Sequence, residues 1–173
     1  MSSNKNYGGQ STLDRRNGDH LEKYLTFIVD NEIYGLEILK VREIVAMLHI
    51  SKVPLVPHYV KGVINLRGNV IPVIDMRLKF NMSDIDYDEH TTIIIVDIEE
   101  ISVGFIVDET SEVVKINQNN LMPPPKFGTG IDTSFLKSMA KTDKSIIMMI
   151  NLEEIFSSDE IQSLSINNEN EEE

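Results

Sequence analysis

Few residues of this 173-residue chain have the types and spacing that chemistry requires. The four histidines show neither the i, i+4 nor the alternate-residue spacing of zinc ligands. Asp84, Asp86 and Asp88 are spaced like the first ligands of a calcium loop, but Glu89 stands where the turn needs glycine and Ile95 where a bidentate acid is needed. The sequence contains no G-x-S-x-G turn and no glycine-rich phosphate loop. We therefore expect no catalytic activity, no metal and no cofactor.

Arg67 is the residue whose setting points to binding. It lies in a predicted turn, Arg67-Gly68-Asn69, between two runs rich in apolar, β-branched residues, 63–66 and 70–74. We expect the turn to hold the guanidinium close to apolar residues, where it needs a planar acceptor. Glu43 is the favoured internal partner. Two interpretations stay open: the pair simply stabilises the fold, or it shapes a groove that a partner occupies.

The elements that must position Arg67 are mostly short strands. Alternating apolar residues predict strands at 25–29, 33–38, 63–66, 70–74, 91–97, 101–107, 112–116 and 145–150. Residues 39–45 are either a helical turn or an irregular strand. Two prolines predict an extended segment over 53–57, three more predict a loop over 122–130, and Asn151 with Glu154 predicts the start of a short helix. Many short strands with few helices favour an all-β barrel or sandwich.

A weak internal repeat relates two parts of the chain. Gly35 is followed eight residues later by Glu43, and Gly104, 69 residues after Gly35, is followed eight residues later by Glu112. This spacing suggests two similar small β-barrels packed against each other. The alternative is a chance similarity between amphipathic strands.

Composition limits the classes of partner. A net charge of −12 would repel phosphate backbones, so nucleic acid is not expected to bind. The absence of cysteine fits a reducing compartment, and the lack of a leader or a long apolar run indicates a cytoplasmic protein. Residues 1–19 are polar and are predicted to be disordered. Residues 157–173, with six acidic residues and no basic one, are predicted to form a short helix and an acidic disordered tail.

One long motif resembles a known family. Residues 53–77 read VPLVPHYVKGVINLRGNVIPVIDMR, which resembles the signature of the CheW family, the bacterial chemotaxis coupling proteins. Segments 32–44 and 103–113 extend the resemblance, which covers about residues 22–156. It implies two SH3-like five-stranded β-barrels around a shared apolar core, with short helices that include a C-terminal one. The CheW-like domain is expected over residues 20–156, with its first barrel built from the N- and C-terminal parts and its second from the middle.

The resemblance also implies a function. It is that of a non-catalytic adaptor that couples the cytoplasmic hairpin tips of chemoreceptors to the regulatory domain of the CheA histidine kinase. Such a protein reaches the membrane only through receptor arrays and is expected to be a monomer when free. A β-barrel module that binds another helical or peptide partner remains the alternative.

Carried over position by position, the resemblance implies a receptor-binding groove between the barrels. Its residues are Val41, Glu43, Gly62, Asn65, Arg67, Gly104 and Val113. Glycines at the edge of such a groove would let a partner's backbone approach closely. The kinase contact is expected at exposed apolar barrel ends and is not assigned to individual residues. Two positions depart from the family pattern: Ser138 stands in place of a glycine, and Met76 in place of a leucine.

Overall fold

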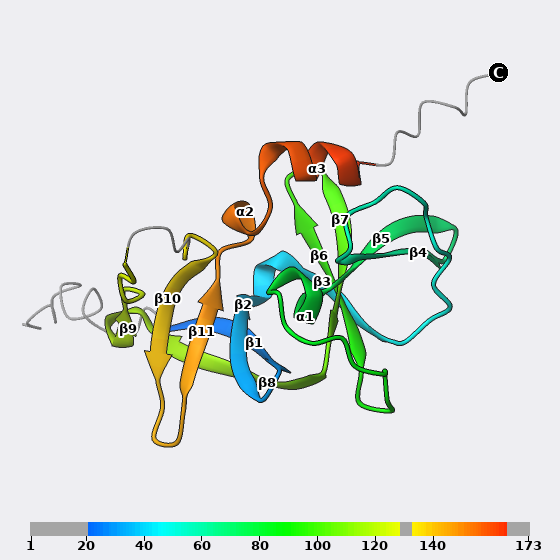
Figure 1. Cartoon of the computed structure of the whole chain (residues 1–173). Helices are drawn as coiled ribbons and strands as arrows, with labels where there is room; N and C mark the ends of the chain where they lie inside the picture. The colour runs from blue at the N-terminus through cyan, green and yellow to red at the C-terminus, as the bar shows by residue number, and fades with distance from the viewer. Residues whose placement is uncertain (1–20, 129–132, 166–173) are drawn as a thin grey trace, which may run out of the picture.

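The computed structural model describes residues 21–128 and 133–165, so the predictions for residues 1–19 and for the acidic end lie outside the described residues. Two sheets lie side by side, with α2 and α3 above them (Figure 1). The first has the strand order β8-β1-β2-β11-β10-β9 and the second has the order β3-β6-β7-β5-β4. Within the described residues, no helix is long and apolar enough to cross a membrane.

The first sheet consists of β1 (Leu21–Val29), β2 (Glu32–Glu37), β8 (Glu109–Asn117), β9 (Leu121–Met122), β10 (Leu136–Lys141) and β11 (Ile146–Ile150). The second consists of β3 (Val41–Ala46), β4 (Val60–Leu66), β5 (Asn69–Asp75), β6 (Thr92–Ile98) and β7 (Ile101–Val107). The helices are α1 (Met76–Lys79), α2 (Leu152–Ile155) and α3 (Ser158–Leu164), with 3-10 turns at Ile38–Lys40 and Gln118–Asn120. The predicted mainly β class, with a C-terminal helix, is confirmed. The first sheet has six strands instead of five because β9 adds a two-residue edge strand.

The sequence repeat corresponds to a repeat in the topology. Gly35 of β2 pairs in parallel with Met149 of β11, and Gly104 of β7 pairs in parallel with Val73 of β5. In both places glycine is needed for packing, because an added Cβ would lie 2.6 Å from the Met149 sulfur or 2.9 Å from Val73. The repeat is therefore a real structural relationship and not a chance similarity.

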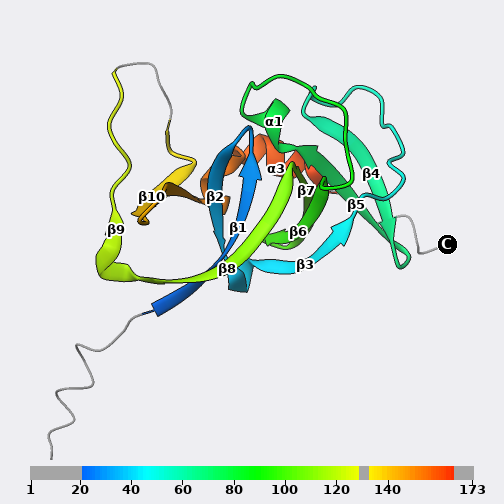
Figure 2. The ribbon, with the colours of Figure 1, turned by 90° about the horizontal axis from the view of Figure 1, so that it is seen from below.

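Each half of the chain contributes one strand to the sheet of the other half. The segment that follows β2 forms β3 and pairs with β6 of the second sheet, whereas β8, which follows β7, pairs with β1 of the first sheet. In Figure 2, β3 and β8 run along the lower edge of the molecule, and α1 lies at the upper edge. Each sheet therefore contains strands from both halves of the chain.

A single large apolar core lies between the sheets and the C-terminal helices. Its members include Phe27 and Leu36 of the first sheet, Ile94 and Phe105 of the second, and Ile161 of α3. Two smaller clusters lie within the individual sheets. The predicted shared core is confirmed, and the C-terminal helices form part of it.

Several local predictions need correction. Residues 53–57 are not extended throughout, because Leu55 has φ +60° in a turn. The proline rule restricts only the residue before each proline, which leaves Leu55 free. The turn between β4 and β5 contains two residues, Arg67 and Gly68, because Asn69 already pairs with Leu66. Residues 39–45 divide into the end of a 3-10 turn and most of β3.

The C-terminal elements also differ from the prediction. Asn151 precedes α2, but its side chain makes no capping hydrogen bond there. The capping box lies one helix later, where Ser157 and Glu160 each bond the other's backbone N–H at the start of α3.

Strand β10 was not predicted. Its inward positions are occupied by Leu136, Ser138 and Ala140, so only one of them is a large apolar residue.

Candidate functional site

The β4–β5 turn presents Arg67 at its tip. Arg67 has φ +51° and Gly68 has φ +87°, as in the two-residue turns that match the twist of a hairpin. Asn65 supports the turn, because its Oδ1 accepts a hydrogen bond of 2.8 Å from the backbone N–H of Gly68. A left-handed backbone is unusual for a residue other than glycine, asparagine or aspartate. Arg67 therefore occupies this turn at a local cost in backbone energy.

Arg67 and Glu43 form the predicted pair. The Arg67 Nη2 donates to Glu43 Oε2, which joins the β4–β5 turn to β3, at the opposite end of the sheet's strand order. The Arg67 side chain is 69% exposed and that of Glu43 is 26% exposed. The expectation that the Arg67 side chain lies close to apolar residues is not met, because most of that side chain is exposed to solvent. An ion pair this accessible contributes only about 0–1 kcal/mol to stability, so stability alone does not explain it.

Gly62 serves an internal contact. It has φ +143° and is buried, and an added Cβ would lie 2.0 Å from the carbonyl oxygen of Ser51. Ser51 and Val63 exchange two backbone hydrogen bonds of 2.9 Å beside it. Gly62 thus lets the β3–β4 loop approach β4, and its place at the edge of a receptor groove stays a prediction.

Gly104 is also buried, beneath Ile93 and Val73 inside the second sheet. Both glycines therefore accommodate the protein's own chain and do not present free backbone to a partner. A substitution at either position would act through the arrangement of β4, β5 and β7.

The remaining predicted residues divide between the two sheets. The structure brings Glu43, Asn65 and Arg67 together around the turn. Val41 lies two residues before Glu43 at the start of β3, where it is half-buried against the shared core. Val113 is 51% exposed on β8, which pairs with β1 in the other sheet. Val41 and Val113 thus lie on the two exchanged strands.

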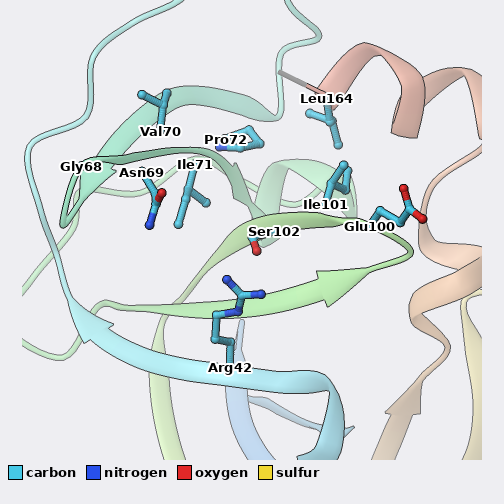
Figure 3. A pocket seen from close by; sticks show the side chains of 10 residues that line it. All are labelled: Arg42, Gly68, Asn69, Val70, Ile71, Pro72, Glu100, Ile101, Ser102 and Leu164. Atoms are coloured by element: carbon cyan, nitrogen blue, oxygen red, sulfur yellow. The ribbon is translucent and has the colours of Figure 1, made fainter. Parts of the chain in front are cut away.

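A cavity of about 440 Å³ adjoins the turn (Figure 3). It lies where β5 and β7 separate, since they pair only over Val73–Asp75 and Gly104–Ile106. Arg42 points across it toward Ser102, and both side chains bond Asp97, at 3.1 Å from Arg42 Nη2 and 2.8 Å from Ser102 Oγ. Sequence reasoning missed this group. The only local signal was the alternation that places Arg42 on the opposite face of β3 from Glu43.

Ion pairs of Arg77, in α1, link the first sheet to the second. Arg77 donates from Nε and Nη2 to the Asp108 carboxylate at 2.8 Å and 2.6 Å and also pairs with Asp30 at 3.4 Å. The hydrogen bonds from Arg77 to Asp108 raise the pKa of Arg77. Because Asp30 belongs to the β1–β2 turn and Asp108 connects β7 with β8, this arginine ties the first sheet to the second.

Ser138, which stands where the family pattern has a glycine, leaves a polar group buried in the structure. Ser138 is buried in β10 beside an irregularity in the pairing with β11. Among the described residues, its hydroxyl has no hydrogen-bond partner. A glycine would place no polar atom there. The other departure, Met76, is fully buried in the shared core, as an apolar residue of leucine's size should be.

Comparisons with known proteins agree with this architecture. The model of the CheW-like domain matches residues 23–160. The chain is 32% identical over 154 residues to the chemotaxis protein CheW of Klebsiella aerogenes, covering 88% of this chain and 93% of that protein. It is 32% identical over 143 residues to CheW of Bacillus subtilis, covering 82% and 91%. The crystal structure of the scaffolding protein TtCheW from Thermoanaerobacter tengcongensis superposes with a TM-score of 0.74 at 39% identity, covering 81% and 95%. The chain belongs to the CheW family of chemotaxis scaffold proteins.

Proposed function

We propose that this protein is a non-catalytic chemotaxis adaptor that binds the cytoplasmic tip of chemoreceptors on one surface and the regulatory domain of CheA on another. Family membership supports the absence of catalysis and the cytoplasmic location at receptor arrays. The observation that carries the receptor part is the accessible Arg67–Glu43 pair at the tip of an energetically costly turn. Local strain of this kind is typical of functional positions.

The receptor surface is proposed to centre on Arg67. A guanidinium has five N–H donors, and Glu43 accepts from one of its nitrogens, so donors remain for amides or carboxylates of a receptor helix. Glu43 fixes the direction of the side chain and thereby the register of the partner. Val113, which is exposed on β8 of the other sheet, is proposed to supply apolar contact area to the same partner. Val41, Gly62, Asn65 and Gly104 are proposed to act by holding this surface in shape.

The kinase surface is proposed to include the β3–β4 loop at the end of the second sheet. This loop exposes apolar side chains that no other described element covers, with Leu55 fully exposed and Val53 and Val56 more than one-third exposed. Burying such side chains against a partner contributes up to about 1.5–3 kcal/mol each. The loop is a different segment from the β4–β5 turn that carries Arg67, so the two proposed contacts use different residues.

Titration with a receptor cytoplasmic fragment and a CheA regulatory fragment tests the proposal. Arg67→Ala should weaken receptor binding about tenfold, because hydrogen bonds to charged groups contribute about 1.5–3 kcal/mol. CheA binding and the melting temperature should stay unchanged. Lys137→Ala is the matched control, since Lys137 forms a similarly exposed pair with Glu37 in the other sheet. If neither fragment binds at micromolar concentrations, the adaptor function is refuted in favour of another helical or peptide partner.

A further inference from the structure

A second and larger cavity, of about 690 Å³, lies where the first sheet, α1 and the C-terminal helices meet. Its apolar walls come from separate parts of the chain: Tyr34 of β2, Phe80 and Met82 after α1, Phe135 before β10, and Phe156 between α2 and α3. Its volume falls within the roughly 300–1,000 Å³ of small-molecule sites. Its exposed lining combines these apolar side chains with polar ones such as Asn81 and Glu154. None of the residues proposed for receptor or kinase binding lines it.

The walls of this cavity are aromatic and already ordered. The Phe80 ring stacks on Tyr34 with centroids 5.4 Å apart and lies 5.2 Å from the Phe135 ring. Tyr34 and Phe156 are buried, whereas Phe80, Met82 and Phe135 are half-buried and keep apolar surface open. A flat apolar group in the cavity would therefore contact rings that are held in place. Aromatic pairs of this kind contribute about 0.5–1.5 kcal/mol beyond the burial of area.

The charges around the cavity favour a cation. Glu160 is fully engaged, because it accepts hydrogen bonds from Lys79 Nζ at 2.7 Å, from the backbone N–H of Ser157 at 3.2 Å, and from the Tyr59 hydroxyl. Burial opposes its ionisation, but these bonds outweigh burial and lower the pKa of Glu160 to about 2. Lys79 is thus neutralised by Glu160 and also lies over the rings of Tyr59 and Phe156.

Glu154 supplies the uncompensated charge. Its side chain is exposed and lines the cavity, and within residues 21–128 and 133–165 it has neither a hydrogen bond nor an ion pair. Asn81, which is also exposed at the cavity, adds an amide acceptor. One free carboxylate beside aromatic walls discriminates against anions and leaves neutral molecules without an ionic partner.

We propose that this cavity binds a small aromatic cation, with its ring against Phe80 and Phe135 and its ammonium group paired with Glu154. Both halves of the chain contribute walls, so the bound molecule would contact the first sheet, the segment after α1 and the C-terminal helices together. Binding to the folded state alone also stabilises it, and the melting temperature should rise with ligand concentration.

Tryptamine is a suitable probe because the chain contains no tryptophan, so indole fluorescence reports the probe alone. Indole and indole-3-acetate are its neutral and anionic counterparts. We expect saturable binding that is tightest for tryptamine, weaker for indole and weakest for indole-3-acetate. Binding of indole-3-acetate as tight as that of tryptamine, or no saturation at millimolar concentrations, would overturn the proposal.

Two variants distinguish the contribution of the Glu154 charge to binding from the contribution of the aromatic rings. Glu154→Gln should weaken tryptamine binding about two- to fivefold, in line with an exposed ion pair, and leave indole binding unchanged. Glu153→Gln is the matched control, since Glu153 pairs with Lys40 beside a different cavity. Phe135→Ala should weaken the binding of all three probes.

A second measurement locates the binding site in the unaltered protein, so it does not depend on whether Phe135→Ala folds correctly. In the unaltered protein, the methyl resonance of Met82 should shift on addition of tryptamine, whereas that of fully buried Met76 should not. An unmoved Met82 resonance at saturating tryptamine would place the binding elsewhere and refute the assignment.

Discussion

At the scale of single residues, the β4–β5 turn shows a conflict between backbone preference and side-chain function. Asn-Gly is the usual sequence for such a turn, since both residues need positive φ, yet here the first position is Arg67. The pair with Glu43 is too exposed to offset the backbone cost by a large margin. The proposed contact between this guanidinium and a receptor would account for an arginine at position 67.

Arg67→Asn tests this interpretation. Asparagine tolerates the left-handed backbone, so the free energy of unfolding should stay equal or rise by up to about 1 kcal/mol. Receptor binding should nevertheless fall, because the donors of the guanidinium are lost. Chemical denaturation and titration with the receptor fragment measure the two effects. A clear loss of stability with unchanged receptor binding would show that Arg67 has a structural role instead.

Ser138 offers a second test at this scale. Its buried hydroxyl lacks a partner among the described residues, and an unsatisfied buried polar group costs about 1–3 kcal/mol. Ser138→Ala should therefore raise the free energy of unfolding by roughly 1 kcal/mol. Ser145→Ala, at an exposed hairpin position where the hydroxyl contacts Thr142, serves as the comparison. Destabilisation by Ser138→Ala would mean that the hydroxyl has a partner after all.

At the scale of elements, α3 is attached to the rest of the molecule by burial and by one carboxylate. Ile161 and Leu164 are buried in the shared core. Glu160 accepts hydrogen bonds from Tyr59, just before β4, and from Lys79, at the end of α1. Because the folded-state pKa of Glu160 is about 2, below its ordinary value of 4.5, the charged form is favoured by folding. Its contribution is complete above about pH 4.5 and is lost as the pH falls toward 2.

Glu160→Gln should remove this part of the pH dependence. The shift corresponds to a contribution on the order of 2 kcal/mol at neutral pH. The variant should be less stable at pH 7, and the difference from the unaltered protein should shrink between about pH 4.5 and 2. Denaturation at a series of pH values measures it. A difference that stays constant across this window would contradict the account.

The hairpins were predictable because their signals are local. Alternating apolar residues and turn residues such as Asp30-Asn31 lie within a few positions of each other, and the structure has these hairpins at the predicted places. Strand β10 was not predictable from the sequence, because the segment LKSMAK forms a strand through its pairing with β9 and β11. The Arg67–Glu43 pair could be inferred, but its exposure depends on how far the turn projects. The aromatic cavity joins residues as distant as Tyr34 and Phe135, beyond any local pattern.

At the scale of the whole molecule, strand exchange and the shared core make the two sheets one unit. β3 and β8 cross between the halves, Arg77 ties Asp30 to Asp108, and α3 closes the core. A rigid unit of this kind suits an adaptor, because the positions of two partners are then fixed relative to each other.

The most direct test of the adaptor function is whether one molecule binds both partners at once. Analytical ultracentrifugation of this protein with a receptor cytoplasmic fragment and the CheA regulatory domain distinguishes binary from ternary complexes. We predict a ternary complex containing all three components. At receptor-fragment concentrations near the dissociation constant of the unaltered protein, Arg67→Ala should shift it largely to the binary complex with CheA. Mutually exclusive binding, or a ternary complex that Arg67→Ala leaves intact, would contradict the account.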